Sequence, residues 1–179
     1  MAKKAKTEEA NKRLALVRVR GEVRINTDTK DTLGMLHLRR ANFCCIVDNR
    51  PQYKGMVNKV KDYIAWGEID EKTLAGLLSK WARKSGDERL TPEDLKAKKF
   101  ASFEDFAKKF LDFKAEFSDL GIKPMFRLHP PSKGHERAGI KLAYSQGGAL
   151  GYRGAGINEL IAKMAGLRSE SKSKAKTKE

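Results

Sequence analysis

Residues 43–64, FCCIVDNRPQYKGMVNKVKDYI, carry the strongest signals for secondary structure in this sequence. Its first five residues are apolar without interruption and are followed by an aspartate, a pattern typical of a central, buried strand. Pro51 comes soon after, and proline is favoured in the first turn of a helix. Met56 and Val60 then recur at helical spacing, so we predict that a helix follows the strand and runs to about Tyr63.

Two further strands and one helix surround this stretch. Residues 14–20 have an alternating pattern that predicts a half-buried strand. Ala15, Val17 and Val19 would face one way, and Leu16, Arg18 and Arg20 would face the other. Asp28 is placed to cap a helix through Leu38. Residues 65–69 are suited to a third strand. The order β-α-β-α-β predicts one sheet with both helices on one side, an α+β sandwich.

Residues 71–120 are predicted to form a helical insertion packed on this core. Asp70 is placed to cap a helix to about Lys84, and Thr91 precedes a proline and two acids, which is a strong helix start. Ser102 begins a further helix that carries five phenylalanines at intervals of three and four residues. They are Phe103, Phe106, Phe110, Phe113 and Phe117. A one-sided stripe in a nearly neutral segment favours core packing over stacking on RNA bases.

The rest of the chain, residues 121–167, is predicted to contain a strand, a basic glycine-rich arm and a short helix from about Asn158. Residues 134–156 contain seven glycines interleaved with cationic and tyrosine side chains. Such a stretch has two interpretations, a floppy linker or an extended arm that becomes ordered against RNA. Residues 1–13 and 168–179 are predicted to be a mobile basic tail and a disordered Lys/Ser tail.

The charge of the chain indicates a polyanionic partner. Lys and Arg number 38 against 23 Asp and Glu, a net charge of +15. The excess lies at the two ends, with +6 over residues 1–70, +1 over 71–120 and +8 over 121–179. The sequence contains no apolar run of the length that spans a bilayer, and no apolar run behind its charged start that would form a secretory signal.

Motifs for catalysis or metal binding are scarce. The adjacent Cys44 and Cys45 would point to opposite faces of a strand, so they cannot pair, and free thiols suit a reducing cytoplasm. His129 and His135 lack further ligands for a closed zinc site and are better suited to phosphate or ribose. Residues 151–154, GYRG, match the minimal GxxG loop that clamps nucleic acid in KH domains, without the helices around it. We therefore expect no enzyme, no cofactor and no metal.

Three segments together resemble a known family. They are LGMLHLRR at 33–40 followed by CCIVDN at 44–49, PQYKGMVNKV at 51–60 followed by YIAWG at 63–67, and FRLHPPSKG at 126–134. The ordered set resembles large-subunit ribosomal protein thirty in its long archaeal form, whose eukaryotic counterpart is large-subunit protein seven. The absence of a long basic N-terminal helix favours an archaeon over a eukaryote, and the positive charge argues against an extreme halophile.

The resemblance implies a ferredoxin-like core over residues 14–70, no catalysis, and a structural role in the cytoplasmic ribosome. The implied partners are large-subunit ribosomal RNA and neighbouring large-subunit proteins, with no membrane and no small-molecule substrate. The alternative is an RNA-binding regulator or chaperone outside the ribosome. Resemblance, charge and helix-terminus physics together predict the RNA contacts. These are Arg39, Arg40, Arg50, Gln52, Lys54, Gly55, Met56, Asn58, Lys59, Arg127, His129, Lys133, His135, Arg137, Lys141 and Arg153.

Overall fold

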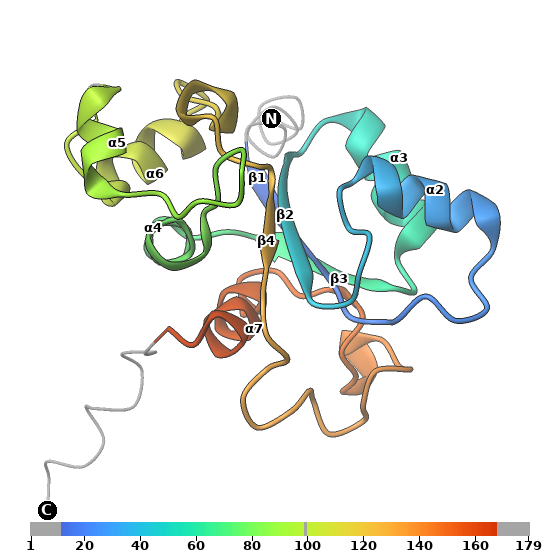
Figure 1. The fold of residues 1–179 in the computed structure, drawn as a ribbon. Coiled ribbons are helices and arrows are strands. Elements are labelled where there is room, and N and C mark those ends of the chain that lie inside the picture. Colours follow the sequence, from blue (N-terminus) through green and yellow to red (C-terminus); the bar gives the residue numbers. More distant parts are fainter. Residues whose placement is uncertain (1–11, 99, 168–179) are drawn as a thin grey trace, which may run out of the picture.

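A computed structural model describes residues 12–98 and 100–167, and the predictions for residues 1–11 and 168–179 lie outside that range. The first half forms the predicted β-α-β-α-β order (Figure 1). Its elements are β1 (Arg13–Arg18), α2 (Thr27–Met35), β2 (Phe43–Asp48), α3 (Pro51–Val60) and β3 (Ile64–Glu68). Arg13, which we assigned to the mobile tail, is the first residue of β1.

Five strands form one sheet in the order β4-β2-β1-β3-β5. The central β1 is antiparallel to both neighbours, with Leu16 opposite Cys45 of β2 and Trp66 of β3. Two short strands extend the sheet: β4 (Met125–Arg127) pairs antiparallel with β2, and β5 (Gly151–Tyr152) pairs parallel with β3. The α+β class and the ferredoxin-like core are therefore confirmed.

The prediction that α2 and α3 lie on one side of the sheet is confirmed, but the prediction that β1 is half-buried is wrong. Figure 1 shows α2 and α3 on one side of the sheet, with α4 (Glu71–Trp81) and α6 (Phe103–Leu111) on the other. Every residue of β1 is buried: Leu14 and Leu16 pack toward α2 and α3, whereas Ala15 and Val17 pack toward the other helices. The two cysteines also divide between these cores, as predicted, and both thiols are free.

The helical insertion packs on the second face of the sheet. A capping box at Thr91 starts α5 (Pro92–Ala97), and the Ser102 hydroxyl accepts the Asp105 N–H at 3.2 Å, so both predicted helix starts are confirmed. The helix from Ser102 is shorter than predicted, because Phe113 adopts a left-handed φ of 60° and the Lys114 N–H turns back to the Lys109 carbonyl.

The phenylalanines still form the core of the insertion, as predicted. Phe117 lies in a separate 3₁₀ turn, η1 (Phe117–Leu120), and stacks on Phe110 with ring centroids 4.2 Å apart. Phe106 and Phe110 are fully buried, whereas Phe113 is 37% exposed beyond the end of the helix. The stripe is therefore a core cluster drawn from two elements and not one continuous helix face.

The predicted extended arm is folded. Residues 138–150 close a loop through hydrogen bonds such as Ala149 N–H to the Gly139 carbonyl, at 3.0 Å, and contain the 3₁₀ turn η2 (Tyr144–Gln146). Ala149 and Leu150 are buried in the core between the sheet and the helices α4 and α6, and this burial anchors the loop despite its glycines. The predicted last helix is present as α7 (Gly156–Ala165). No helix within residues 12–98 and 100–167 is both long and apolar enough to cross a membrane.

Candidate nucleic-acid interface

The N-terminal end of α3 carries the first group of predicted contacts. Arg50 is the N-cap residue, and Pro51 follows at the first helical position. The first-turn N–H groups and the positive end of the helix dipole favour an anion there. Arg50 is exposed, but its guanidinium lies 2.9 Å from Asp48, which also pairs with Arg13 at 3.2 Å. The positive field of Arg50 at the helix start is therefore partly neutralised.

Along α3 the predicted residues divide into two exposed faces. Lys54 and Asn58 are one turn apart and share a face, and Gly55 and Lys59 share the next. Gln52 is exposed on the first turn. Met56 differs, because it is half-buried and packs against the core between α3 and the sheet, so its role is anchoring.

The loop after α2 carries the second group, and a buried arginine shapes it. Arg18 is only 1% exposed, and its guanidinium donates to the carbonyls of Leu38 and Arg39 at 2.8 and 2.6 Å. The helix ends with His37 at a left-handed φ of 58°, so His37 lies beyond α2 and not on it as predicted. These contacts turn the backbone so that Arg39 and Arg40 are exposed.

A basic groove of about 430 Å³ lies at the β2–β4 edge. Its lining residues are His37, Arg39, Arg40, Phe43, Met125 and Arg127. Arg127 donates to Asp87 at 3.1 Å. Lys123 also binds Asp87, and its hydrogen bond is the main cause that lowers the pKa of that carboxyl group. Three predicted residues from distant segments are therefore brought together, and within the described residues only Arg127 of the three forms a salt bridge.

The third group, in the folded loop, only partly matches the prediction. Lys133, Arg137 and Lys141 are exposed. Arg153 is 6% exposed, donates to the Ala149 carbonyl at 3.1 Å and pairs with Glu136 at 3.2 Å. Its burial and these bonds, which hold the loop closed, do not favour the predicted contact with RNA. Residues 151–154 do not form a KH loop, in line with the missing helices noted in the sequence, because Gly151 and Tyr152 form β5 and Arg153 is buried.

The two histidines lie in different environments. His129 is exposed and makes an edge-to-face contact with Trp81, with ring centroids 5.0 Å apart. His135 is half-buried, and its pKa is lowered by burial and by the charge of Arg153. Within residues 12–98 and 100–167, no three His, Cys, Asp or Glu side chains are grouped so that they could hold a metal ion.

Sequence patterns give no sign of a second basic hollow. A hollow of about 610 Å³ lies between α4 and the end of α7, and Arg83, Arg89 and Lys163 contribute to it beside His129. Its cations belong to segments of different charge, and the insertion as a whole is nearly neutral, so regional net charge gave no signal for it.

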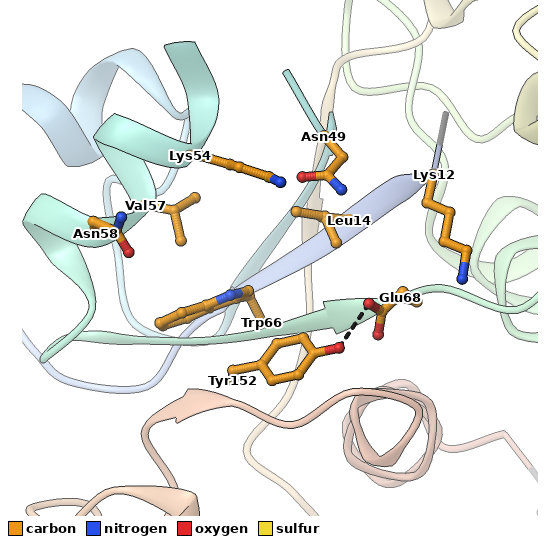
Figure 2. Close-up of a pocket in the computed structure, with 9 residues that line it drawn as sticks. All are labelled: Lys12, Leu14, Asn49, Lys54, Val57, Asn58, Trp66, Glu68 and Tyr152. Atoms are coloured by element: carbon orange, nitrogen blue, oxygen red, sulfur yellow. Dashed lines mark hydrogen bonds between the residues drawn. The ribbon is translucent and has the colours of Figure 1, made fainter. Parts of the chain in front are cut away.

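A pocket between α3 and β3, which we call the α3–β3 pocket, was also missed. It measures about 440 Å³, and the side chains that matter most to its chemistry are Lys12, Lys54, Asn58, Trp66, Glu68 and Tyr152. Figure 2 shows Lys54 and Asn58 on the α3 side and the two aromatic rings on the other. Tyr152 lies beside Trp66 because the Arg153 N–H bonds the Trp66 carbonyl at 2.8 Å, a pairing that local sequence patterns do not reveal.

Comparison with known proteins places this fold in the class of ribosomal proteins. The family described as "Ribosomal protein L30p/L7e" matches residues 14–64. The large ribosomal subunit protein uL30 of Nanoarchaeum equitans is 52% identical over 147 residues, covering 82% of this chain and 95% of the relative. The uL30 protein of Methanopyrus kandleri is 46% identical over 148 residues, covering 82% and 99%. The chain belongs to the L30p/L7e family, and the predicted resemblance is confirmed.

Proposed function

We propose that this protein is a structural constituent of the large ribosomal subunit that binds ribosomal RNA and neighbouring large-subunit proteins. The observation that carries the proposal is similarity over nearly the whole length of relatives named as large-subunit proteins. Its family is one of structural components, so the role is to hold RNA in place and not to transform it.

The exposed cations supply the proposed RNA contacts. One surface is α3, with Arg50, Gln52, Lys54, Gly55, Asn58 and Lys59, and another is the basic groove with Arg39, Arg40 and Arg127. Lys133, Arg137 and Lys141 extend the contacts onto the folded loop, with His129 and His135 near it. Cations of this kind bind phosphates by charge, and the free N–H groups at the start of α3 add directional hydrogen bonds.

Sedimentation with ribosomal subunits tests the proposal. Tagged protein expressed in archaeal cells should migrate stoichiometrically with large subunits through a sucrose gradient and remain there after a moderate salt wash. A protein that stays in the light fractions, with RNA bound, would instead support the regulator or chaperone outside the ribosome.

Charge removal tests the proposed surface. Lys54→Ala combined with Lys59→Ala should weaken binding to purified large-subunit RNA, because two phosphate contacts are lost. The matched control is Lys96→Ala combined with Lys98→Ala, which removes the same charge from exposed positions of the insertion. Equal weakening by both pairs would mean that only the net charge matters and that α3 is not a specific contact surface.

A further inference from the structure

The α3–β3 pocket has a shape and chemistry that the phosphate contacts do not require. Its floor is apolar, formed by Leu14 and Val57, which are both buried. One wall is aromatic: the Trp66 and Tyr152 rings lie 6.5 Å apart at an angle of 48°. Tyr152 is 56% exposed although it is a large ring, so solvent reaches this wall. An accessible aromatic wall above an apolar floor is suited to a flat, aromatic ligand.

The rim of the pocket is polar and mostly basic. Lys12 and Lys54 lie at its edge, and Figure 2 shows the Lys54 chain crossing from α3 toward the middle of the pocket. Asn58 adds an exposed amide, which both donates and accepts hydrogen bonds. Glu68 accepts the Tyr152 hydroxyl at 2.7 Å through one carboxylate oxygen, and its other oxygen is an additional acceptor.

We propose that this pocket receives one unpaired RNA base, stacked on the aromatic wall, while Lys12 and Lys54 bind the adjoining phosphates. The inference rests on the proposed function and names the kind of RNA element that the surface around α3 would bind. Bases in a duplex are stacked and paired and cannot enter a pocket, whereas a base in a loop or bulge can be turned out onto an aromatic side chain. Glu68 and Asn58 are placed to meet the polar edge of that base.

The backbone around the pocket holds the aromatic wall in place. A Cβ at Gly67 would collide with the Gly154 carbonyl oxygen, so only glycine lets the turn after β5 approach β3 this closely. That approach sets Tyr152 against Trp66. The wall therefore exists before any ligand arrives, and binding a base does not require this part of the chain to become ordered.

Fluorescence of Trp66 tests the proposal. The chain has two tryptophans, so Trp81→Phe leaves Trp66 as the sole reporter. Single-stranded oligoadenylate or oligouridylate RNA should quench Trp66 emission at saturation, whereas a blunt RNA duplex of equal length should bind by charge and leave the emission nearly unchanged. Equal quenching by duplex and single strand, or quenching by neither, would overturn the proposal.

A matched pair at Tyr152 separates stacking from hydrogen bonding. Tyr152→Ala should reduce affinity for the single strand by roughly 5- to 150-fold, the range for loss of one base–aromatic stack, with little change for the duplex. Tyr152→Phe keeps the ring and should retain most of the affinity. If the Ala variant, folded by circular dichroism, bound single strands normally, the pocket assignment would fail. Sedimentation with large subunits would still test the proposed function independently.

Discussion

At the scale of single residues, two buried arginines decide how exposed cations are presented. Arg18 was expected on an outer face, yet the covered sheet buries it, and burial lowers the pKa of its guanidinium. The charge is compensated by four backbone carbonyls, those of Arg20, Gly21, Leu38 and Arg39. In the folded loop, the buried guanidinium of Arg153 likewise donates to a backbone carbonyl, that of Ala149. Each of these buried cations holds a segment of the chain in place, and Arg153 also pairs with Glu136.

We predict that Arg18→Met destabilises the fold. Methionine leaves buried carbonyls without donors, and each unpaired buried acceptor costs about 1–3 kcal/mol of unfolding free energy. The change should also weaken RNA binding through Arg39 and Arg40, because their loop loses its anchor. Urea denaturation and RNA titration measure the two effects. Arg20→Met is the control, since the Arg20 side chain makes one exposed hydrogen bond, to the Asp62 carbonyl, and one cation–π contact, with Tyr63. If both variants were equally stable, Arg18 would not anchor the loop.

Phe110→Ala is predicted to lower the free energy of unfolding by about 3–5 kcal/mol, the cost of emptying a buried aromatic site. Phe110 is 1% exposed, stacks on Phe117 and lies 3.7 Å from the Arg13 guanidinium. Phe113→Ala, at a partly exposed position, should cost much less. RNA affinity of the folded fraction should be unchanged by either. Normal stability with weak RNA binding in the Phe110 variant would mean that the ring stacks on bases.

At the scale of elements, helix ends matter as much as helix faces. Both α2 and α6 end with a non-glycine residue in the left-handed region, His37 and Phe113, and the following N–H bonds back to the helix. The first of these ends directs the chain toward Arg39 and Arg40. The second releases Phe117 from the helix so that it can stack on Phe110 from a separate turn.

The folded loop should be sensitive to acid through His135. Burial and the neighbouring Arg153 lower its pKa in the folded state, against a raising effect of Glu136. The unfolded chain therefore takes up the proton first, so stability should be constant well above the ordinary pKa of about 6.5 and fall as the pH drops below it. Denaturation at several pH values should show this loss in the wild type and a smaller loss in His135→Gln. Identical pH profiles would contradict the prediction.

At the scale of the whole molecule, a sheet covered on both faces carries cations on several sides. The ferredoxin-like core presents α3 and the basic groove, and the insertion and α7 present the second basic hollow. A rigid body with separate basic surfaces can contact more than one RNA segment at once, which is the arrangement expected of a structural protein in a folded RNA.

Binding to purified large-subunit RNA should weaken steeply with salt, because each neutralised phosphate releases counterions. A plot of the logarithm of the affinity against that of the salt concentration should be linear with a negative slope. Removing Lys54 and Lys59 together should make the slope shallower by roughly 1–2 units. An affinity that held constant between low and moderate salt would contradict an electrostatic interface.

The α+β core, the order of its elements and the family could all be predicted from the amino-acid sequence. Strand and helix periods, Pro51 and the caps at Thr91 and Ser102 are local signals, so they can be read without knowing the fold. Local signals also located most of the exposed cations, because charge at a helix end or in a loop is usually solvated.

Which faces of the sheet are covered, and which charges are exposed, could be known only from the folded structure. The helices on the second face of the sheet lie far along the chain from β1, so its alternation could not show that both faces are covered. Arg18 lies on the face of Leu14 and Leu16, where the loop after α2 buries it. The arm is folded because Leu150 reaches a distant core and Arg153 meets Glu136. The α3–β3 pocket likewise joins α3, β3 and β5. Burial and convergence depend on contacts between remote segments, and no local pattern contains them.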